Sequence, residues 1–182
     1  VIAYPTDSSY ALGCHIGDKA AMERLRRIRR VDKDHHFTLV CRDLSELAQY
    51  ARVTDADYRL LRATTPGPYT FILPATRGVP RRLQHPKRKT IGLRVPDHVI
   101  AQALLAELGE PLMSSTLIFP GEKLPPSDPE EIRARLEHDV DLIVDGGFCG
   151  LEPTTVVVLD DGQVTIARQG KGEIAPFTGV PH

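Results

Sequence analysis

Arginines concentrated in two short stretches are the side chains best suited to chemistry in this chain, because guanidinium groups bind carboxylates and phosphates. Residues 24–30 read RLRRIRR, with five arginines in seven positions. Residues 77–94 carry seven arginines and lysines and no acid, whereas residues 122–161 hold eleven acids and three bases. A local anion site is therefore compatible with a net charge of only −1.

Arg29 is the first arginine singled out by its position. On a helical projection Ala21, Leu25 and Ile28 form an apolar face, and Arg29 falls near its edge. A guanidinium at that edge needs an anionic partner or a helix end that frees it. The alternative is an ordinary solvated helix face, which the charge pattern alone leaves open.

Arg94 lies within the apolar strand-like segment IGLRVPDH at residues 91–98. If its side chain faces inward it must be paired, and bidentate binding of a carboxylate or phosphate is its best use. The alternation of Ile91, Leu93 and Val95 puts Arg94 on the opposite face, so an exposed position is equally compatible. His98 is more typical of a helix cap than of a catalyst.

Hydroxyl groups near strand ends are further candidates. Residues 5–13, PTDSSYALG, follow a strand-like run, and ligands of open α/β sheets bind beyond the carboxyl ends of strands. The alternative is that this stretch only caps a turn. No GxxxxGK[ST] or GxGxxG loop occurs. His35 and His36 have no partner at metal spacing, so no protein metal ligands are predicted.

The elements that must position these residues alternate between strand-like and helical runs, which predicts one α/β domain over residues 1–182. Asp128 and Pro129 predict a helix start, and Asp160-Asp161-Gly162 predicts a hairpin between the last two strands. We expect a twisted mixed parallel and antiparallel sheet with flanking helices and a basic concave surface.

Composition narrows the class of protein. No run of about 18 apolar residues that could cross a membrane occurs, and three widely spaced cysteines predict reduced thiols. We therefore expect a cytoplasmic protein. Residues 1–4 already read as a strand, so we expect the natural chain to begin upstream of Val1.

Six segments, in order, resemble the YrdC family, which includes the threonylcarbamoyl-AMP synthases, and within it the YciO branch. The resemblance covers nearly the whole chain. It rests on YPTDSSYALG (PT[ED]T-x-YGLG in the family), RIR at 27–29 (KxR), PGPYTFIL at 66–73 (PGP-x-T), RVPDH at 94–98 (R-x-P-x-H), PLMSSTLIFPG at 111–121 (P-x-xSTSANxSG) and DGGFCGLEPTTVVVL with Arg168-x-Gly170.

The resemblance implies a nucleotidyltransferase that uses L-threonine, bicarbonate and ATP, with Mg²⁺, to make threonylcarbamoyl-adenylate and pyrophosphate for tRNA modification. It implies that threonine is bound by Ser8, Arg94 and Thr154. It implies that the nucleotide is bound by Arg27, Arg29, Thr116 and Arg168, with Arg27 and Arg29 assigned the catalytic role.

Two departures from the family pattern imply weak or altered activity. Arg27 replaces the lysine of KxR, and a guanidinium does not reproduce a compact ammonium at a phosphate. Ile118 replaces an asparagine, so a hydrogen-bonding amide becomes a hydrocarbon. The alternative function is binding of double-stranded RNA or tRNA, for which the candidate residues are Arg81, Arg82, Lys87, Arg88 and Lys89.

Overall fold

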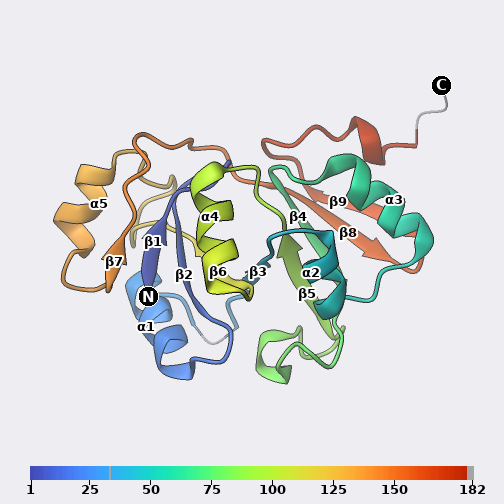
Figure 1. Cartoon of the computed structure of the whole chain (residues 1–182), viewed down its shortest axis with the longest axis horizontal. Coiled ribbons are helices and arrows are strands. Elements are labelled where there is room, and N and C mark those ends of the chain that lie inside the picture. The colour runs from blue at the N-terminus through green and yellow to red at the C-terminus, as the bar shows by residue number, and fades with distance from the viewer. Residues whose placement is uncertain (33, 180–182) are drawn as a thin grey trace.

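The computed structural model describes residues 1–32 and 34–179, and within them nine strands form a single mixed sheet in the order β7-β1-β2-β6-β3-β5-β4-β8-β9 (Figure 1). The strands are β1 (Ile2–Tyr4), β2 (Ala11–His15), β3 (Thr38–Val40), β4 (Tyr69–Pro74), β5 (Thr90–Arg94), β6 (Leu112–Thr116), β7 (Leu142–Ile143), β8 (Thr155–Asp160) and β9 (Gln163–Arg168). The pairs β1–β7, β3–β5 and β4–β8 are parallel and the others antiparallel. The predicted mixed α/β sheet is confirmed.

Five α-helices and two short 3₁₀ turns flank this sheet in the described part of the chain (Figure 1). The helices are α1 (Lys19–Arg29), α2 (Leu44–Tyr50), α3 (Asp55–Thr64), α4 (Val99–Leu108) and α5 (Pro129–Leu136), and the 3₁₀ turns are η1 (Arg81–Leu83) and η2 (Ala175–Phe177). None of these helices is long and apolar enough to span a bilayer.

Helices α1 and α4 cover opposite faces of the sheet. In α1, Leu25 packs into the cluster that includes Leu12 and Met113, whereas in α4, Leu105 packs into the cluster that includes Leu112. Because neighbouring strand residues point to opposite faces, Leu112 and Met113 mark the two sides of β6. The central strands are thereby buried on both faces.

The cap structure of α1 determines where its last arginine lies. Asp18 begins the helix by accepting a hydrogen bond from the amide of Ala21 at 2.9 Å. The helix continues through Arg29 and ends at Arg30, which adopts a left-handed conformation with φ 51°. Since helical residues two apart do not share a face, Arg27 and Arg29 point in different directions.

Two elements begin or turn where the local sequence predicts. Asp128 caps α5 with Pro129 in its first turn, as predicted. Strands β8 and β9 form the predicted antiparallel hairpin around Asp161 and Gly162, both of which have positive φ.

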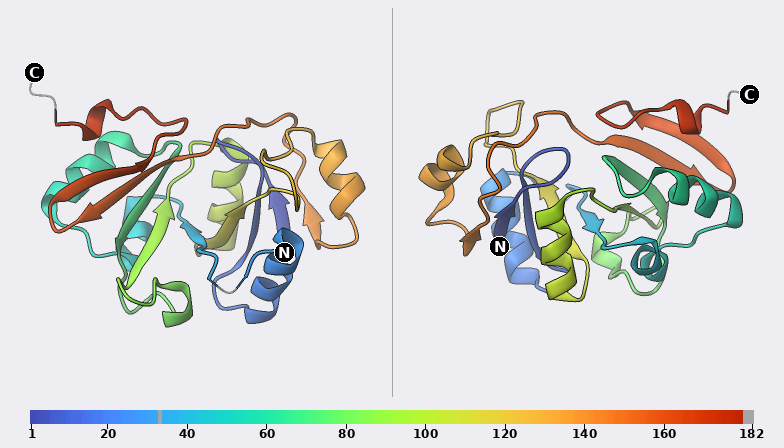
Figure 2. Two further views of the ribbon diagram at one scale, coloured as in Figure 1. Left: turned by 180° about the vertical axis from the view of Figure 1, so that it is seen from behind. Right: turned by 45° about the horizontal axis from the view of Figure 1, so that its top comes forward.

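The long segment between β7 and β8 runs along one edge of the molecule and joins its two halves (Figure 2).

Candidate anion-binding site

A small polar cavity lies where strands from both halves of the sheet end. It is bordered by the loop after β1, by the last residues of β5 and β6 and by the residue that precedes β8. Its volume of about 40 Å³ leaves room for about three waters. It is lined by Tyr4, Thr6, Ser8, Ser9, Ala11, Thr38, Val40, Thr70, Arg94, Ser114, Ser115, Thr116 and Thr154.

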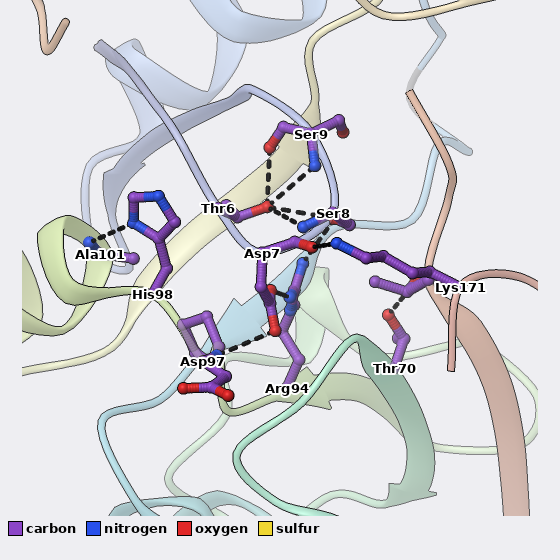
Figure 3. A network of polar contacts seen from close by, with 12 residues as sticks. Thr6, Asp7, Ser8, Ser9, Thr70, Arg94, Asp97, His98, Ala101 and Lys171 are labelled. Carbon is purple, nitrogen blue, oxygen red and sulfur yellow. Dashed lines mark hydrogen bonds and ion pairs between the residues drawn. The ribbon is translucent and has the colours of Figure 1, made fainter. Parts of the chain in front are cut away.

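Arg94 provides the buried positive charge of this cavity (Figure 3). Its Nη1 donates to Ser8 Oγ at 3.1 Å, and its Nη2 forms an ion pair with Asp7 Oδ1. Arg94 and Asp7 side chains are only 8% and 10% exposed. The Nε of Arg94 is buried and has no partner among the described residues, so the guanidinium keeps one unsatisfied donor.

Asp7 is held from three sides, which fixes the position of Arg94 in turn (Figure 3). The amide of Asp97 donates to Asp7 Oδ2 at 2.9 Å, and Lys171 Nζ donates to the backbone carbonyl of Asp7. Arg94 therefore faces inward and is paired, which decides between the two interpretations that the strand pattern left open. His98 caps α4 through a 3.4 Å contact from the amide of Ala101 to its Nδ1, as predicted.

Thr154 connects Arg168 to the same cavity. Arg168 donates from Nη2 to Thr154 Oγ1 at 3.0 Å and from Nε and Nη2 to its carbonyl at 3.0 and 2.8 Å. Thr70 Oγ1 lies 2.8 Å from Thr154 Oγ1, next to the parallel pair β4–β8. Partial burial lowers the pKa of Arg168, yet an arginine remains protonated in a protein, so its charge is kept beside the cavity.

Arg29 approaches the cavity from the end of α1. Its Nη1 donates to Ser115 Oγ at 2.6 Å and to the carbonyl of Thr116 at 2.5 Å, and both acceptor residues line the cavity. Burial lowers the pKa of the Arg29 guanidinium, and its Nε is buried without a partner among the described residues. Arg29 is thus a second guanidinium bonded to the wall of this cavity.

His35 contacts the same serine as Arg29. Its Nε2 lies 3.0 Å from Ser115 Oγ, and its ring packs edge-on against Phe37 with centroids 5.3 Å apart. Burial, followed by the nearby charge of Arg29, lowers the pKa of His35 to about 4. The ring is therefore neutral at physiological pH and acts as a hydrogen-bonding group there.

Acid is expected to destabilise the protein through His35. The unfolded chain takes up a proton on this ring near pH 6.5, whereas the folded ring resists protonation until about pH 4. The contribution of His35 to stability is complete above pH 6.5 and is lost as pH falls from 6.5 through 4. Urea unfolding of His35→Gln and of the parent between pH 7 and 4 should show a shallower decline for the variant; parallel curves would contradict this origin.

Arg27 does not join these side chains. It is exposed and lines a separate hollow between α1 and α5, with Arg30, Phe119 and Arg135 among its neighbours. The structure therefore places Arg29 but not Arg27 beside the cavity, because the helix continues past Ile28. The two side chains expected at one nucleotide therefore lie in different places in the structure.

Five of the seven basic residues within 77–94 lie at the other end of β4 and β5, away from Arg94. All five are exposed, and they occupy the loop that includes η1: Arg81, Arg82, Lys87, Arg88 and Lys89. Two further hollows border this loop, and Arg81 lines both of them. The loop forms a basic surface distinct from the cavity that holds Arg94.

Among residues to which the sequence assigned no specific role, Asp7, Thr70, Ser115 and His35 line the cavity or contact its lining residues. Asp7 had a signal, since a buried arginine requires an acid and Asp7 adjoins Ser8. His35 had none, because its role depends on the end of α1 meeting β6. Among the described residues, no group of three or more His, Cys, Asp or Glu side chains is placed to hold a metal ion.

The fold and cavity together define a class: α/β proteins with a buried arginine in a polar cavity suited to carboxylate and phosphate groups. The Sua5/YciO/YrdC family model, described as "Telomere recombination", matches residues 1–170. The chain belongs to this family.

Relatives of two kinds are similar to this chain. Escherichia coli YciO is 57% identical over 97% of this chain and 86% of its own, and its crystal structure has a TM-score of 0.91. A threonylcarbamoyl-AMP synthase of Idiomarina loihiensis is 33% identical over 86% of each chain. The structure of P. abyssi Sua5 complexed with L-threonine has a TM-score of 0.83 at 25% identity, covering 93% of this chain and 50% of the other.

Proposed function

We propose that this chain is a nucleotide-binding enzyme that makes threonylcarbamoyl-adenylate and pyrophosphate from L-threonine, bicarbonate and ATP. The observation that carries the proposal is the meeting of Ser8, Arg94 and Thr154 in one cavity, with Arg29 and Arg168 bonded to residues of its wall. Relatives named as threonylcarbamoyl-AMP synthases, and the Sua5 structure with threonine, support the choice of substrate.

The cavity suits the carboxylate of threonine. Its buried end offers the Ser8 hydroxyl and the Arg94 guanidinium, while Thr154 supplies a second hydroxyl. A carboxylate that accepts these donors gains charge-assisted hydrogen bonds in a place shielded from water. Because the cavity is small, the rest of the substrate lies toward its mouth, where Arg29 approaches.

The chemical step needs positive charge more than covalent participation by the protein. The carbamate oxygen of N-carboxythreonine attacks the α-phosphorus of ATP, and the bond to the departing pyrophosphate breaks. Negative charge on the phosphate oxygens is stabilised by oriented guanidinium groups. We assign this role to Arg29 and Arg168, whose partners Thr116 and Thr154 lie at the cavity wall.

Mg²⁺ is expected to bind together with the nucleotide. Mg²⁺ binds substrate phosphates readily and keeps much of its water shell, so it requires few protein ligands. Hydroxyl groups line the cavity, and within the described part of the chain one carboxylate, that of Asp7, pairs with Arg94. When bound, Mg²⁺ would neutralise part of the triphosphate charge.

Slow turnover is part of the proposal. Arg27 stands where the family has the lysine of KxR, but it lies outside the cavity. It therefore does not supply the positive charge of that lysine at the site. Ile118 offers no amide, and one oriented donor commonly contributes about a hundredfold to rate. Activity below that of an efficient synthase follows from these two differences.

The proposal predicts that pyrophosphate release from ATP depends on both L-threonine and bicarbonate. A coupled pyrophosphate assay with each component omitted in turn provides the measurement, and mass spectrometry identifies the adenylate. Release at the level of a no-enzyme control, despite tight ATP binding, would sink the proposed reaction. Release without threonine would point to a different acceptor of the adenylyl group, such as water.

A further inference from the structure

A second hollow adjoins the candidate site and is built differently. Its volume of about 400 Å³ lies within the range of ligand pockets. It lies between the segment that precedes β3 and the loop that includes η1, and is lined by Asp34, His35, His36, Phe37, Arg81, Arg82, Leu83, Gln84, His85 and Pro86. We call it the histidine hollow.

Two imidazole rings in this hollow are held in fixed positions. His36 and His85 stack with centroids 5.5 Å apart and an interplanar angle of 22°. The Nδ1 of His85 accepts hydrogen bonds from the amides of Lys87 and Arg88 at 3.2 and 3.0 Å. Because Nδ1 is an acceptor, the proton of neutral His85 is on Nε2, which leaves a donor for a ligand.

The charge in the hollow comes from two arginines. Arg82 is fixed by a bond from its Nη2 to the carbonyl of Ile16 at 3.1 Å. In contrast, no hydrogen bond or ion pair within residues 1–32 and 34–179 involves the Arg81 guanidinium. Asp34 is the one acid among the lining residues. Arg81 is therefore the positive group most available to an anion.

The arrangement of positive side chains in the histidine hollow favours a compact anion over an extended polyanion such as RNA. Arg81 and Arg82 border the hollow, but Lys87 and Arg88 do not line it, and Lys89 donates its Nζ to the carbonyl of Pro86 at 2.8 Å. An RNA strand would use the exposed cations of the whole loop, because its phosphates lie along a line. A small multiply charged group matches the pair of arginines and the Nε2 donor of His85.

His35 connects the histidine hollow with the candidate site. Its ring lines the hollow, while its Nε2 contacts Ser115, the serine that Arg29 also binds. We propose that the histidine hollow binds a diphosphate group, either free pyrophosphate or the β,γ-phosphates of a nucleoside triphosphate. Its use for the departing pyrophosphate rests on the proposed function; diphosphate binding itself does not.

Calorimetric titration of the full chain with inorganic pyrophosphate, and separately with ATP, tests this assignment at low salt. Arg81→Gln is expected to weaken binding of at least one of them about tenfold, since a charge-assisted hydrogen bond is lost. Weakening of pyrophosphate and ATP alike supports a site for free diphosphate. Weakening of ATP alone supports a site for the tail of the bound nucleotide.

Arg77→Gln is the matched control, because Arg77 lies in the same loop but lines only the neighbouring hollow beside Arg81. It should change both affinities less than twofold. Equal weakening by Arg77→Gln and Arg81→Gln, or no weakening by either, overturns the assignment. So does an Arg81→Gln variant that loses affinity only for duplex RNA. Pyrophosphate binding without threonine-dependent turnover would contradict the proposed reaction but not this site.

Discussion

Replacement of Arg94 by glutamine is expected to lower the free energy of unfolding by about 3–5 kcal/mol, because removing one partner of a buried ion pair leaves the other charge uncompensated. The charge left behind is Asp7, which keeps the Asp97 amide but loses its only counter-ion among the described residues. The same substitution should abolish threonine-dependent pyrophosphate release. Urea unfolding and the coupled assay provide the two measurements.

The double variant Asp7→Asn/Arg94→Gln separates stability from ligand binding. Without either charge, most of the lost stability should return, since a neutral pair leaves no isolated buried charge. Threonine binding should remain absent, because the guanidinium is still missing. A double variant that binds threonine normally would show that Arg94 supports only the fold.

A methyl group at Gly170 is expected to damage the site through the backbone. A Cβ at this position would lie 2.5 Å from the carbonyl oxygen of Thr154 and 2.6 Å from its carbonyl carbon. That carbonyl oxygen accepts a hydrogen bond from the guanidinium of Arg168. Gly170→Ala should therefore cost about 1–3 kcal/mol of stability and weaken threonine and ATP binding together, measured by urea unfolding and calorimetry.

Gly17→Ala is the matched control for this prediction. A Cβ at Gly17 would meet no atom within 4 Å, so the same added methyl has room there. Stability and both affinities should stay near those of the parent. If Gly170→Ala were equally harmless, the close approach of residues 170 and 154 would not matter to the site.

Local signals in the sequence predicted much of the fold, but strand β2 and helix α3 were missed. The Asp128-Pro129 helix start and the Asp161-Gly162 hairpin were predictable because each depends on neighbouring residues. Strand β2 was not predicted, since ALGCH is buried on both faces at four of five positions and shows no alternation. Helix α3 was also missed, although Thr54 and Asp57 form a capping box at its start.

The candidate site was only partly predictable, because it depends on contacts between distant segments. Arg94 could be singled out as an arginine within an apolar strand, but its face was open until Asp7 was placed beside it. The helical projection set Arg29 apart, but whether Arg27 could join it at one site depended on the exact end of α1, which the sequence left open. His35 contacts Ser115 across 80 residues of sequence, a relation that no local pattern encodes.

The most direct test of the central claim is a crystal structure of this chain with L-threonine and a non-hydrolysable ATP analogue. We expect the threonine carboxylate to contact Ser8 and Arg94, with the α-phosphate between Arg29 and Arg168. Threonine and nucleotide bound elsewhere, with the cavity closed around an unchanged Asp7–Arg94 pair, would contradict the account.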